Sequence, residues 1–143
     1  MANLVRGLVL VAGVVAALLA MPAGAEEAKP AAEARALISR QLDAFAHDDA
    51  PGAYALAAPD LKTKFADADV FMDMVRRQYA PVYRHRSIDF GEAQLDGDAI
   101  AITATIVDGD NQVWTALYKL ARQPDGQWLI NGCMLIKSSQ SAL

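Results

Sequence analysis

The chain has 143 residues, with 13 Lys and Arg against 17 Asp and Glu, so its formal net charge at pH 7 is −4. An acidic chain without a basic tail argues against nucleic acid as the partner. The only cysteine is Cys133, which excludes an intramolecular disulfide.

The first 25 residues have the pattern of a secretory signal peptide. Arg6 precedes an uncharged run over 7–20, and Ala23-Gly24-Ala25 supplies the small residues that a signal peptidase needs. The apolar run is shorter than the roughly 20 residues that span a bilayer. We therefore predict cleavage after Ala25, no stable membrane anchor afterwards, and secretion into a bacterial periplasm. An uncleaved anchor is the alternative.

Cleavage would leave a chain of one-domain size. Loss of residues 1–25 removes Arg6 and leaves 118 residues with 12 basic and 17 acidic side chains, a formal charge of −5. Residues 26–33 are rich in Ala, Glu and Lys and contain Pro30. We predict a flexible leader there, followed by a single domain over 34–139.

Three helices are predicted in the first half of this domain. Apolar residues recur with the 3.6-residue period over about 32–47, which predicts an amphipathic helix. A short second helix is predicted over 51–58, ending at Pro59. A third is predicted over 69–79, with acidic residues near its start, arginines near its end and Pro81 closing it.

Four strands are predicted in the second half, because the apolar period changes to two residues. Ile88 and Phe90 begin the alternation, and it continues over 99–107, 113–122 and 127–137, with Asp- and Gly-rich turns between these segments. Helices followed by strands predict an α+β fold, in which three N-terminal helices pack on a curved four-stranded antiparallel sheet.

The last predicted hairpin allows the two faces of the sheet to be assigned. If Pro124-Asp125-Gly126 is a three-residue loop, Gln123 faces Gln127 and Tyr118 faces Gly132. The helix-facing side then carries Trp114, Tyr118, Leu120, Trp128, Ile130, Met134 and Ile136. The outer side carries Thr115, Leu117, Lys119, Leu129, Asn131, Cys133 and Leu135. A single bulge would reverse this assignment.

Two segments resemble a known family. One runs from Ala57-Ala58-Pro59 through FMDMVRRQYAPVY at 71–83, and the other is YKLARQPDGQWLINGC at 118–133. They resemble a bacterial secreted domain-of-unknown-function family of the nuclear-transport-factor-2-like superfamily. The resemblance implies a cone-shaped fold over nearly the whole mature chain. It implies no reaction, because that superfamily holds isomerases, dehydratases, ligand carriers and catalytically silent domains.

No catalytic residue, cofactor or metal site is predicted. The inward-facing residues of the last two strands include no carboxylate, and Asp89 alternates with apolar neighbours and so points away from them. His47 beside Asp48 and Asp49 could form a metal site or an acid–base pair, but such a cluster is more typical of a helix end. No Ser/His/Asp arrangement, zinc-ligand spacing or phosphate loop is evident.

A cationic and aromatic cluster is the main candidate for a binding site. Over 76–86 it contains Arg76, Arg77, Tyr79, Tyr83, Arg84, His85 and Arg86. Arginine forks match carboxylate and phosphate geometry, so the cluster could hold an anion. The simpler alternative is that the charges complement a helix end and protect an edge strand. The binding hypothesis would fail if Arg76 and Arg84 pointed in opposite directions.

We therefore expect a binding protein more than an enzyme. The candidate pocket or rim residues are Tyr79, Tyr83, Arg84, Trp114, Tyr118 and Trp128, and the expected ligand is small and apolar or anionic. A homodimer through the outer sheet face, around Leu117, Leu129 and Leu135, is a further expectation. The alternative is a cofactor-free lyase or isomerase, in which Tyr118 or Tyr83 donates and Asp43 or His47 acts as base. Cys133 is expected to be a packing residue rather than a redox thiol.

Overall fold

The computed structural model describes residues 23–142, and the predicted signal peptide lies outside them except for residues 23–25. The helices are α1 (Ala23–Ala46), α2 (Ala50–Ala55), α3 (Pro59–Lys62), α4 (Ala68–Gln78) and α5 (Ala80–Tyr83). The strands are β1 (His85–Asp96), β2 (Ala99–Asp108), β3 (Gln112–Arg122) and β4 (Trp128–Ser141).

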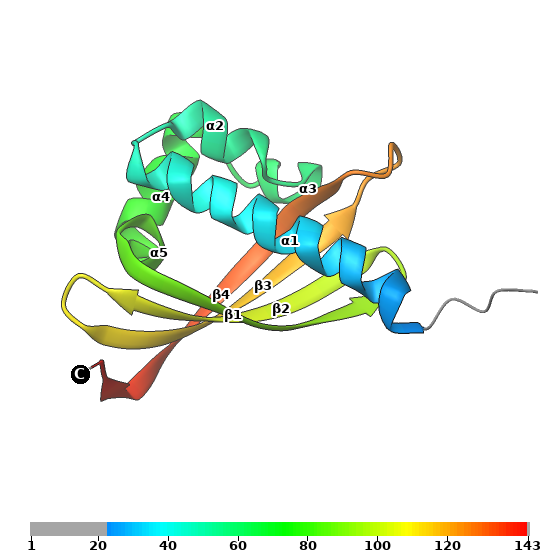
Figure 1. Ribbon diagram of the computed structural model, residues 1–143. Helices are drawn as coiled ribbons and strands as arrows, with labels where there is room; N and C mark the ends of the chain where they lie inside the picture. Colours follow the sequence, from blue (N-terminus) through cyan, green and yellow to red (C-terminus); the bar gives the residue numbers. More distant parts are fainter. Residues whose placement is uncertain (1–22, 143) are drawn as a thin grey trace, which may run out of the picture.

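The strands form one open antiparallel sheet in the order β1-β2-β3-β4. The helices lie on one side of it, with α1 running obliquely over the strands (Figure 1). The expected α+β class and the four-stranded antiparallel sheet are therefore confirmed. Because each strand pairs only with its neighbours in the chain, β1 and β4 are the two edges of the sheet.

The helices differ from the prediction at both ends of the helical half. Residues 26–33, predicted to be a flexible leader, belong to α1. Their Ala, Glu and Lys content favours a helix, Lys29 and Glu33 are an i,i+4 pair at 3.9 Å, and Pro30 is buried. The predicted second helix is α2, which ends at Ala55 because Ala57 leaves the helix to pair with Ile130. The short α3, which begins at Pro59, was not predicted. The third predicted helix ends before Pro81, at Gln78, and Pro81 lies in the first turn of the short α5, which was not predicted.

Aspartate side chains cap the N-termini of two helices. The N–H of Gly52 donates to Asp49 Oδ1 at 3.0 Å at the start of α2. The N–H of Val70 donates to Asp67 Oδ1 at 2.9 Å at the start of α4. Each carboxylate satisfies a backbone donor that the first helical turn leaves free.

The hydrophobic core lies between the helices and the sheet. A cluster of aromatic rings around Phe71 holds the helices together. The centroid of the Phe71 ring lies 6.3 Å from that of Phe45, 5.6 Å from that of Tyr54 and 5.3 Å from that of Phe65. The sheet contributes a layer of buried side chains from its central strands and β4: Ile100, Ile102, Ile106, Tyr118, Leu120 and Ile130.

A bulge in β4 corrects the predicted assignment of faces. Leu120 pairs with Ile130 as predicted, but Lys119 pairs with Gly132 and Tyr118 with Cys133, so Asn131 is an extra residue in β4. The assignment is therefore right before the bulge and wrong after it. Cys133 and Leu135 share the helix-facing side with Tyr118, and Met134 and Ile136 lie on the outer face with 55% and 57% of their surface exposed.

The turn before β4 gives a testable consequence. Gly126 has φ of +85°, whereas Gly109 has no positive φ and no heavy atom within 4 Å of an added Cβ. A side chain at positive φ costs about 1–2 kcal/mol. We expect Gly126→Ala to lower the free energy of unfolding by about that amount in urea titrations. Gly109→Ala is the control, and an equal loss in both variants would contradict the argument.

Candidate binding cavity

A small cavity lies between the helices and the last two strands, with a volume of about 70 Å³. It is bounded by α1, α3, α4, α5, β3 and β4. The lining is mainly apolar, and its members are Gln41, Phe45, Leu61, Phe71, Met74, Val75, Tyr79, Val82, Tyr118, Ile130, Gly132 and Cys133. An apolar lining with a few polar groups is typical of a small-molecule site, but the volume is far below the roughly 300–1,000 Å³ of most such sites.

Two deeply buried polar side chains contribute to this lining. Gln41 is 4% exposed, and its Nε2 donates to the carbonyl of Ala53 at 3.1 Å. Tyr118 is 1% exposed, and its hydroxyl forms no well-shaped hydrogen bond with any described group. Burial, and to a lesser extent the nearby Cys133 thiol, raises the pKa of Tyr118 well above its usual value. Tyr118 is therefore a neutral buried donor with no well-shaped hydrogen bond, and its hydroxyl lies beside the Cys133 thiol, which is only a weak acceptor.

The partly exposed lining residues locate the mouth of the cavity. Leu61 and Met74 are half-buried on the helical side, and Gly132 and Cys133 are half-buried on β4. The hydroxyl of Tyr79 bridges the two sides by donating to the carbonyl of Cys133 at 3.1 Å. The cavity therefore opens between α3–α4 and the edge strand, at the bulge.

The bulge also determines the role of Cys133. Without the extra residue Asn131 the Cys133 side chain would face outward, but it lines the cavity beside Tyr118. Burial raises the pKa of Cys133 to about 12. The thiolate is the reactive form of cysteine, so this thiol is unreactive at neutral pH, which agrees with a packing role.

The six residues proposed from the sequence lie in four places. Tyr79 and Tyr118 line the cavity. Tyr83 and Arg84 belong to a polar network at the end of α1. The Nε1 of Trp114 donates to Asp108 Oδ2 at 2.8 Å, away from the cavity. Trp128 lines a larger, more open groove of about 700 Å³ with Leu37 and Arg40, and its buried Nε1 has no partner among residues 23–142.

Gln41 was not predicted as a site residue, although the sequence contains a signal for it. Gln41 lies on the apolar stripe of α1, between Ile38 and Leu42. A polar residue in such a stripe needs a buried partner or a functional reason. Gly132 and Cys133 could not have been placed without knowledge of the bulge.

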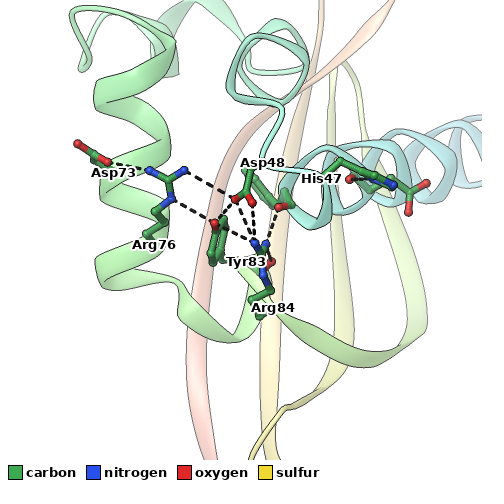
Figure 2. A network of polar contacts seen from close by, with 8 residues as sticks. His47, Asp48, Asp73, Arg76, Tyr83 and Arg84 are labelled. Atoms are coloured by element: carbon green, nitrogen blue, oxygen red, sulfur yellow. Dashed lines mark hydrogen bonds and ion pairs between the residues drawn. The ribbon is translucent and has the colours of Figure 1, made fainter.

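The arginines of the cationic cluster bind the chain's own carboxylates. Figure 2 shows Arg76 and Arg84 pointing toward Asp48, so they do not point in opposite directions. Arg84 Nη2 lies 3.0 Å from both carboxylate oxygens of Asp48, and Arg76 Nη1 lies 3.1 Å from Asp73. The charges of two arginines and two aspartates therefore balance, and the network leaves little free positive charge for an anionic ligand.

Tyr83 lies at the centre of this network. Its hydroxyl donates to Asp48 and accepts from Arg76 Nε at 3.2 Å, and the Arg84 guanidinium lies 3.9 Å from its ring centroid. Arg84 Nη1 also donates to the carbonyl of Phe45 at 2.7 Å. These contacts tie α5 and α4 to the end of α1, all three of which supply walls of the cavity.

The remaining basic residues of the cluster lie outside this network. Arg77 Nε donates to the carbonyl of Asp73 at 3.2 Å, and Arg86 binds the side chain of Asn111. The Nδ1 of His85 is buried without a partner among the described residues. The seven residues of the predicted rim therefore do not form one surface.

The network predicts a pH dependence of stability. The hydroxyl of Tyr83, followed by Arg84, holds the pKa of Asp48 below its usual value. A lowered folded-state pKa gives stability that is present above the unfolded-state pKa of about 3.9 and is lost as the pH falls further. We expect Asp48→Asn to be less stable than wild type at pH 7, with the difference disappearing in acid.

Asn is a suitable replacement because Asp48 has φ of +53°, which Asn tolerates. Urea titrations between pH 2 and pH 8 would measure the difference. Asp60→Asn is the control, because the Asp60 side chain forms no ion pair among the described residues. A difference between Asp48→Asn and wild type that does not change with pH would contradict the prediction.

The proposed bases of the enzyme alternative lie away from the cavity. Asp43 and His47 line a separate shallow groove with Asp49. His47 Nδ1 donates to the carbonyl of Asp43 at 2.8 Å, and Figure 2 shows its ring turned away from Tyr83. Asp89 is exposed opposite Thr105 on the outer face, as predicted.

Residues 23–142 contain neither a cluster of metal ligands nor a helix that could span a membrane. No three His, Cys, Asp or Glu side chains in this part come together in a way that could hold a metal ion. None of the described helices combines the length and the apolar character needed to cross a bilayer.

Comparison with known proteins identifies the family. The family model described as Domain of unknown function (DUF4864) matches residues 27–143. The chain belongs to this family. The match begins within α1 and includes the cavity, the network around Asp48 and the whole sheet. It confirms the resemblance to a domain-of-unknown-function family. No curated protein matches the chain.

Proposed function

We propose that this protein binds a small molecule non-covalently in the cavity between its helices and strands β3 and β4. The observation that carries the proposal is the hydroxyl of Tyr118, which is buried at an apolar cavity without a hydrogen-bond partner among the described residues. Buried polar groups in native proteins nearly always have a partner. A ligand that supplies this partner accounts for a tyrosine at a position where phenylalanine would fit the apolar lining.

The enzyme alternative has less support. A cofactor-free lyase or isomerase needs a carboxylate or histidine within hydrogen-bond reach of the reacting molecule. The described lining residues include neither type, and Asp43 and His47 line another groove. Binding without chemistry is therefore the function that we propose.

We further propose that the domain is a nuclear-transport-factor-2-like cone that a bacterium secretes to its periplasm. The order of helices before an antiparallel sheet and the segments 57–83 and 118–133 support the cone. The basic, apolar and small-residue pattern of residues 1–25 supports secretion.

A homodimer through the outer sheet face is also part of the proposal. The bulge places Met134 and Ile136 on that face, on the same side as Leu117 and Leu129. Exposed apolar patches are often covered in an assembly. Sedimentation equilibrium of the wild type and of Met134→Lys would test it, with a monomeric wild type as the contradicting result.

Native mass spectrometry would test the binding function directly. Full-length protein is expressed in bacteria, purified from the periplasm and compared with Cys133→Leu, in which the larger side chain should occupy the cavity. We expect a bound mass on the wild type that is absent from the variant and is lost on unfolding. The same bound mass on both proteins, or none on either one, would contradict binding in this cavity.

A further inference from the structure

We propose that the ligand is uncharged and carries a hydrogen-bond acceptor, such as a ketone or aldehyde oxygen, that Tyr118 binds at the inner end of the cavity. This inference rests on the proposed binding function and specifies the chemistry of the ligand. It follows from three properties of the cavity: the unpaired donor, the absence of charged side chains from the described lining, and the small volume.

The ligand group that contacts the Tyr118 hydroxyl should be a hydrogen-bond acceptor and not a donor. Its pKa is raised well above the usual value, mainly by burial, so the group stays protonated and has an O–H to donate. The other buried polar lining residue, Gln41, already uses an Nε2 hydrogen to bind the carbonyl of Ala53. A site whose buried donor is met by one ligand and left unpaired by its analogue discriminates strongly between the two.

Charge is disfavoured in the cavity. The lining residues are apolar or neutral polar, and none is Asp, Glu, Lys, Arg or His. The nearby arginines Arg76 and Arg84 point to Asp48 and Asp73 instead of into the cavity (Figure 2). An ion buried here would lose its hydration without gaining a counter-charge. The anionic ligand considered from the sequence is therefore replaced by a neutral one.

The size of the cavity limits the buried part of the ligand. A water-sized group needs roughly 10–15 Å³ of such volume. The volume of about 70 Å³ therefore accepts roughly five or six non-hydrogen atoms. A longer ligand would extend through the mouth between Met74 and Cys133, with its acceptor group inside.

Two molecules of nearly the same shape allow the contribution of the hydrogen bond to affinity to be measured apart from that of the apolar contacts. Cyclopentanone fits the volume and carries one acceptor, and methylenecyclopentane replaces its oxygen by a CH₂ group. Each is titrated into wild type and Tyr118→Phe, with binding followed by the backbone amide signals in NMR. We expect Tyr118→Phe to weaken cyclopentanone binding about tenfold and to change methylenecyclopentane binding by less than about twofold.

Tyr54→Phe is the matched control. The hydroxyl of Tyr54 donates to the carbonyl of Lys62 at 3.3 Å, and Tyr54 is not among the lining residues, so neither affinity should change. Isobutyrate, a carboxylate of similar size, should bind the wild type at least tenfold more weakly than cyclopentanone. In the wild type alone, the ring-carbon signals of Tyr118 should shift more with cyclopentanone than with methylenecyclopentane, which gives a reading even if Tyr118→Phe does not fold.

The outcomes distinguish the inference from the proposed function. Equal losses of affinity for both molecules in Tyr118→Phe would overturn the inferred hydrogen bond while leaving a binding cavity. Isobutyrate binding as tight as that of cyclopentanone would overturn the neutral class. If none of the molecules binds the wild type, the binding function itself fails, and the inference fails with it.

Discussion

Replacing Phe71 by alanine is expected to lower the free energy of unfolding by about 3–5 kcal/mol. Phe71 is buried on α4, and its ring contacts those of Phe45, Tyr54 and Phe65. Those partners come from α1, α2 and the segment before α4, so one truncation loosens the whole helical layer. Urea titration followed by circular dichroism would measure the change.

Val70→Ala provides the control for Phe71→Ala. Val70 is the preceding residue on the same helix, but 44% of its surface is exposed. Its truncation should change the free energy of unfolding by about 0.5 kcal/mol or less. Similar losses in the two variants would show that Phe71 is not the packing centre of the helical layer.

Replacing Cys133 by leucine is expected to weaken ligand binding more than tenfold while leaving the fold stable. The leucine would project beside Tyr118 into the cavity of about 70 Å³. Adding methylene groups to a well-packed core costs about 1–3 kcal/mol, but a cavity accepts them with little strain. We therefore expect a change in the free energy of unfolding below about 1 kcal/mol and an affinity for cyclopentanone reduced more than tenfold.

Cys133→Ala is the matched variant for this prediction. It leaves the cavity open, so the binding of cyclopentanone should be retained. The measurement combines urea titration with the NMR titration of each variant. A Cys133→Leu protein that binds as the wild type does would place the ligand elsewhere, and one destabilised by about 3 kcal/mol would show that the site is already filled.

The sequence predicts the elements well where local patterns decide them. The helix predicted over 69–79 is α4 (Ala68–Gln78), because Asp67 caps its start and an apolar face repeats along it. The four strands and the turn at 124–126 also follow from alternation and turn chemistry. Residues 26–33, predicted as a flexible leader, lie within α1, because Ala, Glu and Lys favour helix and the chain there tolerates Pro30.

The site was predicted less well, because it depends on long-range register. The bulge at Asn131 reverses the facing of residues 132–137 in β4, and nothing local in the sequence requires it. Tyr79 and Tyr118 were among the candidates and lie together in the cavity, whereas Trp114 and Arg84 interact with Asp108 and Asp48 instead. The convergence of Arg76 and Arg84 on Asp48 depends on tertiary contacts between α1, α4 and α5.

The stability of Tyr118→Phe, measured with and without ligand, tests the central claim most directly. Urea titration of wild type and variant would be compared with that of Tyr79→Phe, which loses the 3.1 Å bond to the Cys133 carbonyl and should be destabilised by about 1 kcal/mol. Without ligand, Tyr118→Phe should equal the wild type or exceed it by about 1 kcal/mol, because an unpaired buried group is removed.

Excess cyclopentanone should then stabilise the wild type more than Tyr118→Phe, because tighter binding to the folded state gives the larger gain. A loss of about 1–3 kcal/mol in Tyr118→Phe without ligand, followed by equal gains with ligand, would contradict the account. That result would mean that the hydroxyl already has its partner within the protein.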